Sequence, residues 1–250
     1  MGVDCVNFQR LVELSARPDY APGRGLMLGR QGFRVRARLE RFYRRWLSMY
    51  ERGVSIEDLV ADDGYSEKLF KKIGIGDVES MDFSEYEGAQ HLQDLNQSVS
   101  QELHDKFDFI FDGGTIEHVF DIPAALRNVF HMLKDGGVFA STNGLNGWLF
   151  HGMYQFNPEM VYAFWKNMAG CEVLRCLAVS ENPRIRPIAL PDMSASGRRL
   201  RVPDFPEGRV YLYYEVRKTP GAKLSGSALQ SDYQAQWARS DAASKSAEAS

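Results

Sequence analysis

The sequence predicts an α/β fold with a mostly parallel sheet, and residues 107–143 provide most of the evidence. An apolar run at residues 107–111 ends on Asp112, Gly113 and Gly114. A helical pattern follows, and a second Asp-Gly-Gly turn then precedes an apolar run at residues 138–140. Strand, loop, helix, turn and strand in this order make a parallel βαβ unit. Polar groups after its first strand lie where open α/β sheets bind ligands.

Strands and helices alternate along the rest of the chain. Apolar residues at helical spacing predict helices at residues 35–50, 67–73 and 158–168, the last one capped by Asn157. Short apolar or β-branched runs predict further strands at residues 25–28, 78–83, 89–95, 171–179 and 210–216. The last two strands flank a long loop without an intervening helix, which favours an antiparallel closing strand. We therefore expect a seven-stranded sheet.

We expect a single domain at residues 1–218, because a chain of 250 residues can bury a full core. Residues 34–77 form a helical insertion in this domain, and residues 180–208 form a loop rich in proline, arginine and serine. Residues 219–250 contain too few apolar side chains to fold alone, so we expect a disordered tail.

Composition and charge exclude several classes of protein. A net charge of −3 argues against a general nucleic-acid binder, and no apolar run is long enough to span a membrane. The N-terminus has no apolar signal core, so a cytoplasmic location is expected. Cys5, Cys171 and Cys176 form no CxxC pair, which argues against a disulfide framework or a zinc site, and we expect no metal. The sequence does not indicate an oligomeric state.

An ordered set of residues at successive strand ends narrows the function. The set consists of Gly29, Asp82, Asp94, Asp112, Gly113, Gly114, Glu117, His118, Asp135, Gly136 and Gly137. Together with the block FDFIFDGGTIEHVFD and the following ALRNVFHMLKDGG, it resembles the class I S-adenosylmethionine-dependent methyltransferases. The resemblance covers residues 25–179. It implies a Rossmann-like fold with helices on both faces of the sheet, S-adenosylmethionine as cofactor, and a small-molecule or peptide acceptor.

The resemblance also implies roles for individual residues. Asp82 would accept hydrogen bonds from both ribose hydroxyls, and Asp94 with Leu95 would hold the adenine. The loop at residues 112–115 would face the methionine part, where glycines allow close approach of the backbone. The implied cofactor-binding residues are Gly29, Arg30, Gln31, Asp82, Phe83, Asp94, Leu95, Asp112, Gly113, Gly114 and Thr115. An aspartate at a strand end is also a common turn or cap residue, so Asp82 and Asp112 have a purely structural alternative.

The glycine loop after the first strand departs from the family pattern. The family has a GxGxG loop here, whereas this chain has Gly29 followed by the bulky Arg30 and Gln31. Arg30 either pairs with the carboxylate of the cofactor or fills the pocket and abolishes binding. The second outcome would make the protein a non-catalytic scaffold. A nicotinamide-dependent dehydrogenase is the weakest alternative, because it requires GxGxxG at this place.

Candidate catalytic residues lie on the acceptor side of the predicted sheet edge. We name His118, and from the loop at residues 143–156 His151 and Tyr154, which could orient or deprotonate a nucleophile. Glycines and aromatic residues in that loop favour a pocket wall. A packed histidine and helix-packing aromatics would explain the same pattern without chemistry. A base is optional, because aligning two reactants supplies roughly 7–11 kcal/mol on its own.

Overall fold

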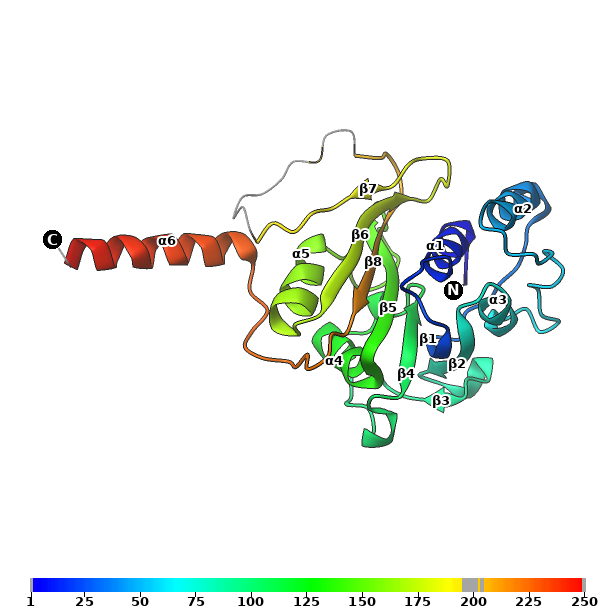
Figure 1. Cartoon of the computed structure of the whole chain (residues 1–250), viewed down its shortest axis with the longest axis horizontal. Coiled ribbons are helices and arrows are strands. Elements are labelled where there is room, and N and C mark those ends of the chain that lie inside the picture. Colours follow the sequence, from blue (N-terminus) through cyan, green and yellow to red (C-terminus); the bar gives the residue numbers. More distant parts are fainter. Residues whose placement is uncertain (1, 195–201, 203–204, 249–250) are drawn as a thin grey trace.

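Eight strands form one sheet at the centre of the described structure, in the order β3-β2-β1-β4-β5-β8-β6-β7 (Figure 1). The computed structural model describes residues 2–194, 202 and 205–248, with the backbone alone for residues 241–248. The strands are β1 (Gly23–Leu28), β2 (Gly76–Asp82), β3 (His91–Leu92), β4 (Phe107–Asp112), β5 (Leu133–Asn146), β6 (Glu172–Ser180), β7 (Ile188–Ala189) and β8 (Val210–Arg217).

The sheet confirms the predicted Rossmann-like arrangement. β3, β2, β1, β4 and β5 are parallel to one another, and β8 lies antiparallel between β5 and β6. The predicted count of seven strands is one short. β7 pairs Ile188 and Ala189 with β6 inside residues 180–208, which the sequence predicts as loop. A strand of two residues is too short to leave a periodic pattern.

Helices cover both faces of the sheet, as predicted (Figure 1). One face packs against α1 (Cys5–Ser15), α2 (Glu40–Met49) and α3 (Glu67–Lys72), and the other against α4 (Ile122–Met132), α5 (Pro158–Met160) and the π-helix η5 (Val161–Met168). Strand alternation divides the core accordingly, because Leu26 and Leu28 face α4 while Met27 faces α1. Short 3₁₀ turns complete the fold at η1 (Ala37–Leu39), η2 (Glu85–Glu87), η3 (Gln101–Leu103) and η4 (Ile116–His118).

Helix α1 is the main element that the sequence does not predict. Asp4 caps it, with the Asn7 amide N–H donating to its side chain at 2.8 Å. Asn7, Gln9 and Arg10 are buried together with the apolar residues of the helix. Because polar side chains share the buried surface, the helix lacks the one-sided apolar stripe that would reveal it.

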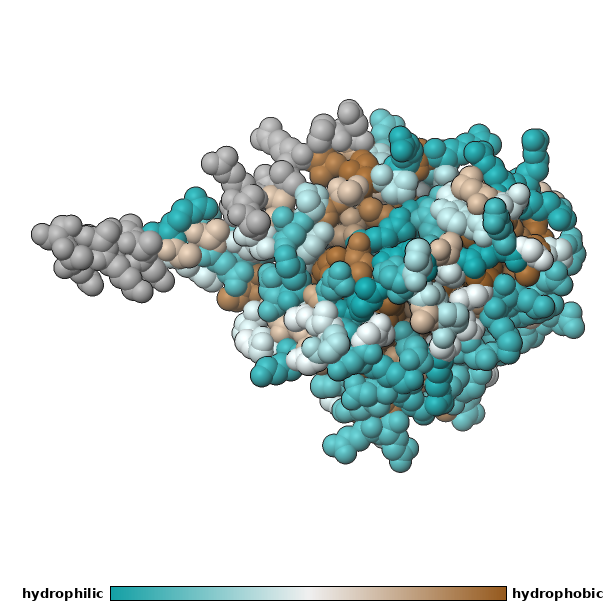
Figure 2. All heavy atoms as spheres, viewed as in Figure 1, coloured by the Kyte–Doolittle hydropathy of each residue, from teal (hydrophilic) through white to brown (hydrophobic). Residues whose placement is uncertain are grey.

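The arginine-rich helix α2 packs by an apolar stripe. Tyr43 and Leu47 are buried against α1, while Arg44 pairs on the surface with Glu40 and Glu57 at 2.7 and 3.0 Å. Figure 2 shows a mainly hydrophilic surface over α2 and α3. Within the described residues, no helix is both long and apolar enough to cross a membrane.

The C-terminal region, which the sequence predicts to be a disordered tail, contains a helix. Residues Ser231–Glu248 form helix α6, which projects away from the body (Figure 1). Its first residue is fixed to the body, because the Ser231 amide N–H donates to Glu159 Oε1 at 2.6 Å. Alanine is the strongest helix former, and it recurs throughout this segment. The segment therefore forms a helix although it has no apolar face to bury.

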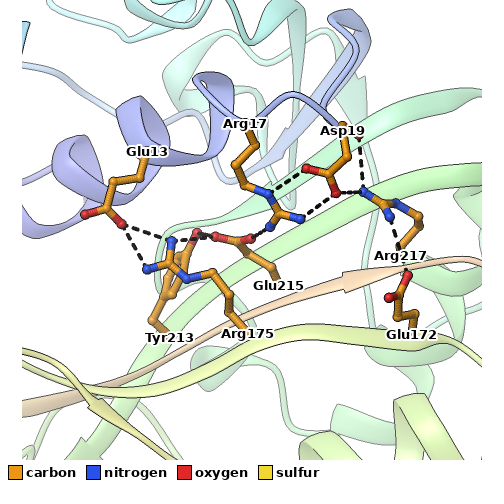
Figure 3. A network of polar contacts seen from close by, with 8 residues as sticks. All are labelled: Glu13, Arg17, Asp19, Glu172, Arg175, Tyr213, Glu215 and Arg217. Atoms are coloured by element: carbon orange, nitrogen blue, oxygen red, sulfur yellow. Dashed lines mark hydrogen bonds and ion pairs between the residues drawn. The ribbon is translucent and has the colours of Figure 1, made fainter. Parts of the chain in front are cut away.

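A buried carboxylate connects the N-terminal segment to the antiparallel half of the sheet (Figure 3). Glu215 on β8 is fully buried and accepts hydrogen bonds from Arg17 at 2.6 Å, Arg175 at 3.3 Å and the Tyr213 hydroxyl at 2.6 Å. Arg17 also pairs with Asp19 at 2.6 Å. The network joins residues almost two hundred positions apart in the sequence, so it fixes how the chain start lies on β8.

Replacing Glu215 by alanine is expected to lower the free energy of unfolding by about 3–5 kcal/mol, because it leaves two arginines without their buried partner. Urea unfolding followed by circular dichroism measures this loss. Glu40→Ala is the matched control, since it breaks only an exposed pair with Arg44 and should cost less than about 1 kcal/mol. Equal losses in the two variants would contradict the structural role of Glu215.

Candidate functional site

A cavity of about 480 Å³ opens at the C-terminal ends of β1, β2 and β4. Eight of the eleven residues predicted to bind the cofactor line it: Gly29, Arg30, Gln31, Asp82, Phe83, Asp94, Leu95 and Thr115. His118, predicted as a catalytic residue, also lines it. Asp112, Gly113, Gly114, His151 and Tyr154 do not. The parallel strands deliver these scattered residues to one edge of the sheet, because their carboxyl ends coincide there.

Asp82 is the last residue of β2 and presents a half-buried carboxylate to the cavity. Its Oδ1 accepts a hydrogen bond from the Phe83 amide at 2.7 Å, and its Oδ2 accepts one from the Arg30 amide at 3.3 Å. A carboxylate has about four acceptor positions, so Asp82 keeps capacity for hydroxyl groups of a ligand.

Asp94 lies further along the same wall, beside the buried Leu95. Its Oδ1 accepts hydrogen bonds from the Asn96 amide at 2.9 Å and the Asn96 side chain at 2.7 Å. Both bonds end on Oδ1, which leaves Oδ2 to accept from a ligand donor. Phe83 stands at the rim and is 75% exposed.

Arg30 neither reaches for a ligand carboxylate nor fills the cavity. Its Nε pairs with Glu67 at 2.7 Å and its Nη2 with Asp63 at 3.0 Å. Nη1 donates to the Glu87 carbonyl at 3.0 Å, and the guanidinium lies 3.9 Å from the centre of the Tyr65 ring. The two carboxylates already neutralise this side chain. Pairing of Arg30 with the carboxylate of a cofactor, one of the two predicted outcomes, would require those contacts to break.

Gly29 and Gln31 join the end of β1 to the loop after β4. Gly29 has φ +67°, and a Cβ on it would lie 2.7 Å from Thr115 Oγ1. The side-chain nitrogen of Gln31, Nε2, donates to the Leu28 carbonyl at 2.8 Å and to Thr115 Oγ1 at 3.2 Å. Its Oε1 is buried and accepts no hydrogen bond from the described residues. The residue lines the cavity, but this oxygen is turned away from it toward Gly113.

Asp112 lies beneath the cavity with a fully buried carboxylate, whereas Thr115 of the same loop lines the cavity. Oδ1 accepts from the Thr115 amide at 2.7 Å and the Ile116 amide at 3.2 Å. Oδ2 accepts from the Ser141 hydroxyl at 2.9 Å and the Asn143 amide group at 2.7 Å. Burial raises the pKa of Asp112, and the four bonds oppose that rise. These four bonds favour the structural alternative, in which Asp112 is a turn residue.

Glu117, His118 and His151 meet beside the cavity. Glu117 is 3% exposed, and its Oε2 accepts from the Gly144 amide at 2.6 Å. Its Oε1 lies 3.0 Å from His151 Nε2 and 3.9 Å from His118 Nε2. Burial raises the pKa of Glu117 to about 7. The sequence predicts roles for both histidines but none for Glu117 alone, since only the fold brings Glu117 to His151.

The loop after β5 folds back over η4 and brings His151 to Glu117. The Met153 amide donates to the Glu117 carbonyl at 2.8 Å. Gly152 has φ +70°, and a Cβ on it would lie 3.0 Å from that same carbonyl, so glycine allows the crossing. Tyr154 takes no part in the cluster, because its hydroxyl donates to the Phe120 carbonyl at 3.0 Å.

Comparison with known proteins shows the family to which the chain belongs. A family model described as a methyltransferase domain matches residues 34–163, which is 130 of the 250 residues. A search of curated proteins by sequence found no match.

Several solved structures are similar to this chain at low sequence identity. The 1,6-didemethyltoxoflavin-N1-methyltransferase of Burkholderia thailandensis, solved with S-adenosylhomocysteine, has 12% identity and a TM-score of 0.45, covering 87% of this chain and 80% of its own. A putative sarcosine dimethylglycine methyltransferase of Galdieria sulphuraria has 12% identity and a TM-score of 0.47, with coverages of 86% and 85%. The N-methyltransferase NodS of Bradyrhizobium japonicum has 12% identity and a TM-score of 0.43, with coverages of 85% and 86%.

Asp112→Ala is expected to lower the free energy of unfolding by at least about 3 kcal/mol, because each buried donor left unpaired costs roughly 1–3 kcal/mol. Guanidinium unfolding without ligand measures the change. Asp82→Ala is the control, since its half-buried carboxylate accepts only two local bonds and its loss should cost about 1 kcal/mol. If the Asp112 variant is as stable as the Asp82 variant, the structural role of Asp112 is wrong.

Proposed function

Because the chain belongs to the methyltransferase-domain family and is an S-adenosylmethionine-dependent methyltransferase, we propose that the cavity at the ends of β1, β2 and β4 holds this cofactor and that the loop after β5 holds the acceptor. The observation that carries the proposal is the Asp82 carboxylate, which ends β2 at the cavity wall with acceptor capacity to spare. Two neighbouring ribose hydroxyls are a suitable pair of donors for one carboxylate.

The cavity fits the cofactor in size and in donor set. Its volume of about 480 Å³ lies in the range of roughly 300–1,000 Å³ that small-molecule pockets occupy. We assign the adenine to the wall that Asp94 and Leu95 form. We place the methionine part near Gln31 and Thr115, which line the cavity where β1 meets the loop after β4. The Gln31 side chain would contact the methionine part where the family has glycines, which this loop lacks.

The bound cofactor supplies an activated methyl group on a sulfonium, and in-line attack by the acceptor would release a neutral thioether. The protein therefore needs mainly to align the acceptor with the methyl group. We place the acceptor against His118, which lines the cavity, and the neighbouring His151. Tyr154 would support the wall through its bond to the Phe120 carbonyl rather than touch the methyl group.

Exposed apolar side chains around the acceptor side favour an acceptor with an apolar portion. Phe120 is 73% exposed and Leu149 is 76% exposed, and Phe150 and Met153 on the same loop are exposed as well. Single exposed apolar residues are common, but three of these lie on the segment that carries His151, and Phe120 follows His118 by two positions, which favours a role in binding. We infer a small molecule or a peptide with an apolar part as the acceptor class.

The non-catalytic alternative depended on Arg30 filling the cavity. The guanidinium instead turns to Glu67 and Asp63, and the cavity stays open. The substituted glycine loop is therefore compatible with cofactor binding.

Asp82→Ala is expected to weaken S-adenosylhomocysteine binding by about 1–3 kcal/mol, which is roughly a 5- to 150-fold rise in Kd, because the ribose hydroxyls lose their acceptor. Isothermal titration calorimetry measures it. Asp62→Ala, at an exposed acid outside the cavity, should bind like the unmodified protein. Unchanged affinity in the Asp82 variant would refute the ribose assignment.

A further inference from the structure

Glu117, His118 and His151 each offer one metal-ligand atom, and these three atoms lie within 4.8 Å of one another. Among the described residues, no other histidines, cysteines and acids form a group of three with this spacing. His104 and His131 also stack, with ring centres 4.9 Å apart, but they belong to no such group. The close spacing of one carboxylate and two imidazoles thus distinguishes the cluster of Glu117, His118 and His151 from the stacked histidine pair.

The cluster has a buried side and an open side. The Glu117 side chain is 4% exposed, whereas those of His118 and His151 are 42% and 36% exposed. An ion bound by all three would be held from the protein side and would keep coordination positions open toward solvent. His118 also lines the cofactor cavity, so those open positions would lie beside it.

Neighbouring backbone groups already orient the carboxylate. Glu117 Oε2 accepts from the Gly144 amide at 2.6 Å, which leaves Oε1 directed toward the two histidines. The Glu117 amide donates to Asn143 Oδ1 at 3.2 Å, and its carbonyl accepts from Met153. Such outer contacts are what hold ligands in place at metal sites.

The donor set selects the type of metal. Two imidazoles and one carboxylate with open positions suit divalent first-row transition metals, in contrast to the all-oxygen sites preferred by magnesium and calcium. The sequence predicts no metal site, because its three cysteines form no CxxC pair. His118 and His151 are thirty-three positions apart, so only the folded loop after β5 brings them together.

We propose that Glu117, His118 and His151 bind a divalent first-row transition-metal ion at the acceptor side of the cofactor cavity. The role of this ion rests on the proposed function, although its binding does not. It would coordinate two adjacent oxygen atoms of the acceptor and lower the pKa of a bound hydroxyl. The acceptor class is then narrowed to compounds with neighbouring oxygens, such as a catechol, a vicinal diol or a hydroxy acid.

Titration with cobalt chloride tests the site directly, because cobalt(II) bound to nitrogen and oxygen ligands has a visible spectrum. The protein is first stripped with a chelator, and any affinity tag containing histidines is removed. We expect one ion per chain with a visible absorption band, and competition by zinc. Glu117→Gln and His151→Asn should each raise the cobalt Kd at least about 10-fold. His131→Asn, in the stacked pair that lacks a carboxylate, should leave the Kd unchanged.

Unfolding curves of each variant show whether it still folds. Glu117→Gln is expected to fold, because its side-chain oxygen can still accept the hydrogen bond from the Gly144 amide. Absence of a cobalt band in the stripped protein would overturn the inference, as would an unchanged Kd in both folded ligand variants. Titration of the same samples with S-adenosylhomocysteine separates the two proposals. A protein that binds S-adenosylhomocysteine but not cobalt would refute the metal site alone. A protein that binds cobalt but not S-adenosylhomocysteine would refute the cofactor cavity alone.

Discussion

The buried carboxylate of Asp112 accepts hydrogen bonds from both sides of the site. Amides of Thr115 and Ile116 donate to one oxygen, and side chains of Ser141 and Asn143 donate to the other. A charge removed from water is tolerated only when such partners surround it. This requirement fixes the end of β4, the loop that follows it and the end of β5 relative to one another. Most other contacts of the site start from these groups.

Two lines of contacts lead away from Asp112. Toward the cavity, Thr115 donates to the Leu28 carbonyl at 2.7 Å, which joins the loop after β4 to the end of β1. Toward the acceptor side, Asn143 accepts from the Glu117 amide, and the next residue, Gly144, donates to the Glu117 carboxylate. Glu117 in turn contacts His151. The residue that the family resemblance assigns to the ligand therefore supports both halves of the site from below.

The sequence predicted what regular periodicity and strand ends encode. Short apolar runs locate β1 and β4, and carboxylates at the ends of the following strands locate Asp82 and Asp94 on the cavity wall. The sequence does not reveal which groups pair with each charged side chain. Nothing local in the sequence distinguishes the paired guanidinium of Arg30 from a free one, because Asp63 and Glu67 lie more than thirty positions away. The same distance in sequence separates Glu117 from His151, and helix α1 is hidden by its buried polar residues.

A crystal structure of the complex with S-adenosylhomocysteine tests the central claim most directly, namely that the strand-end cavity holds the cofactor. We predict that both ribose hydroxyls donate to the Asp82 carboxylate, with the adenine beside Leu95 and the sulfur on the side of Thr115 and His118. Ligand found instead in the separate cavity of about 510 Å³ beside Tyr162 and Leu190, or with its ribose turned away from Asp82, would contradict the account.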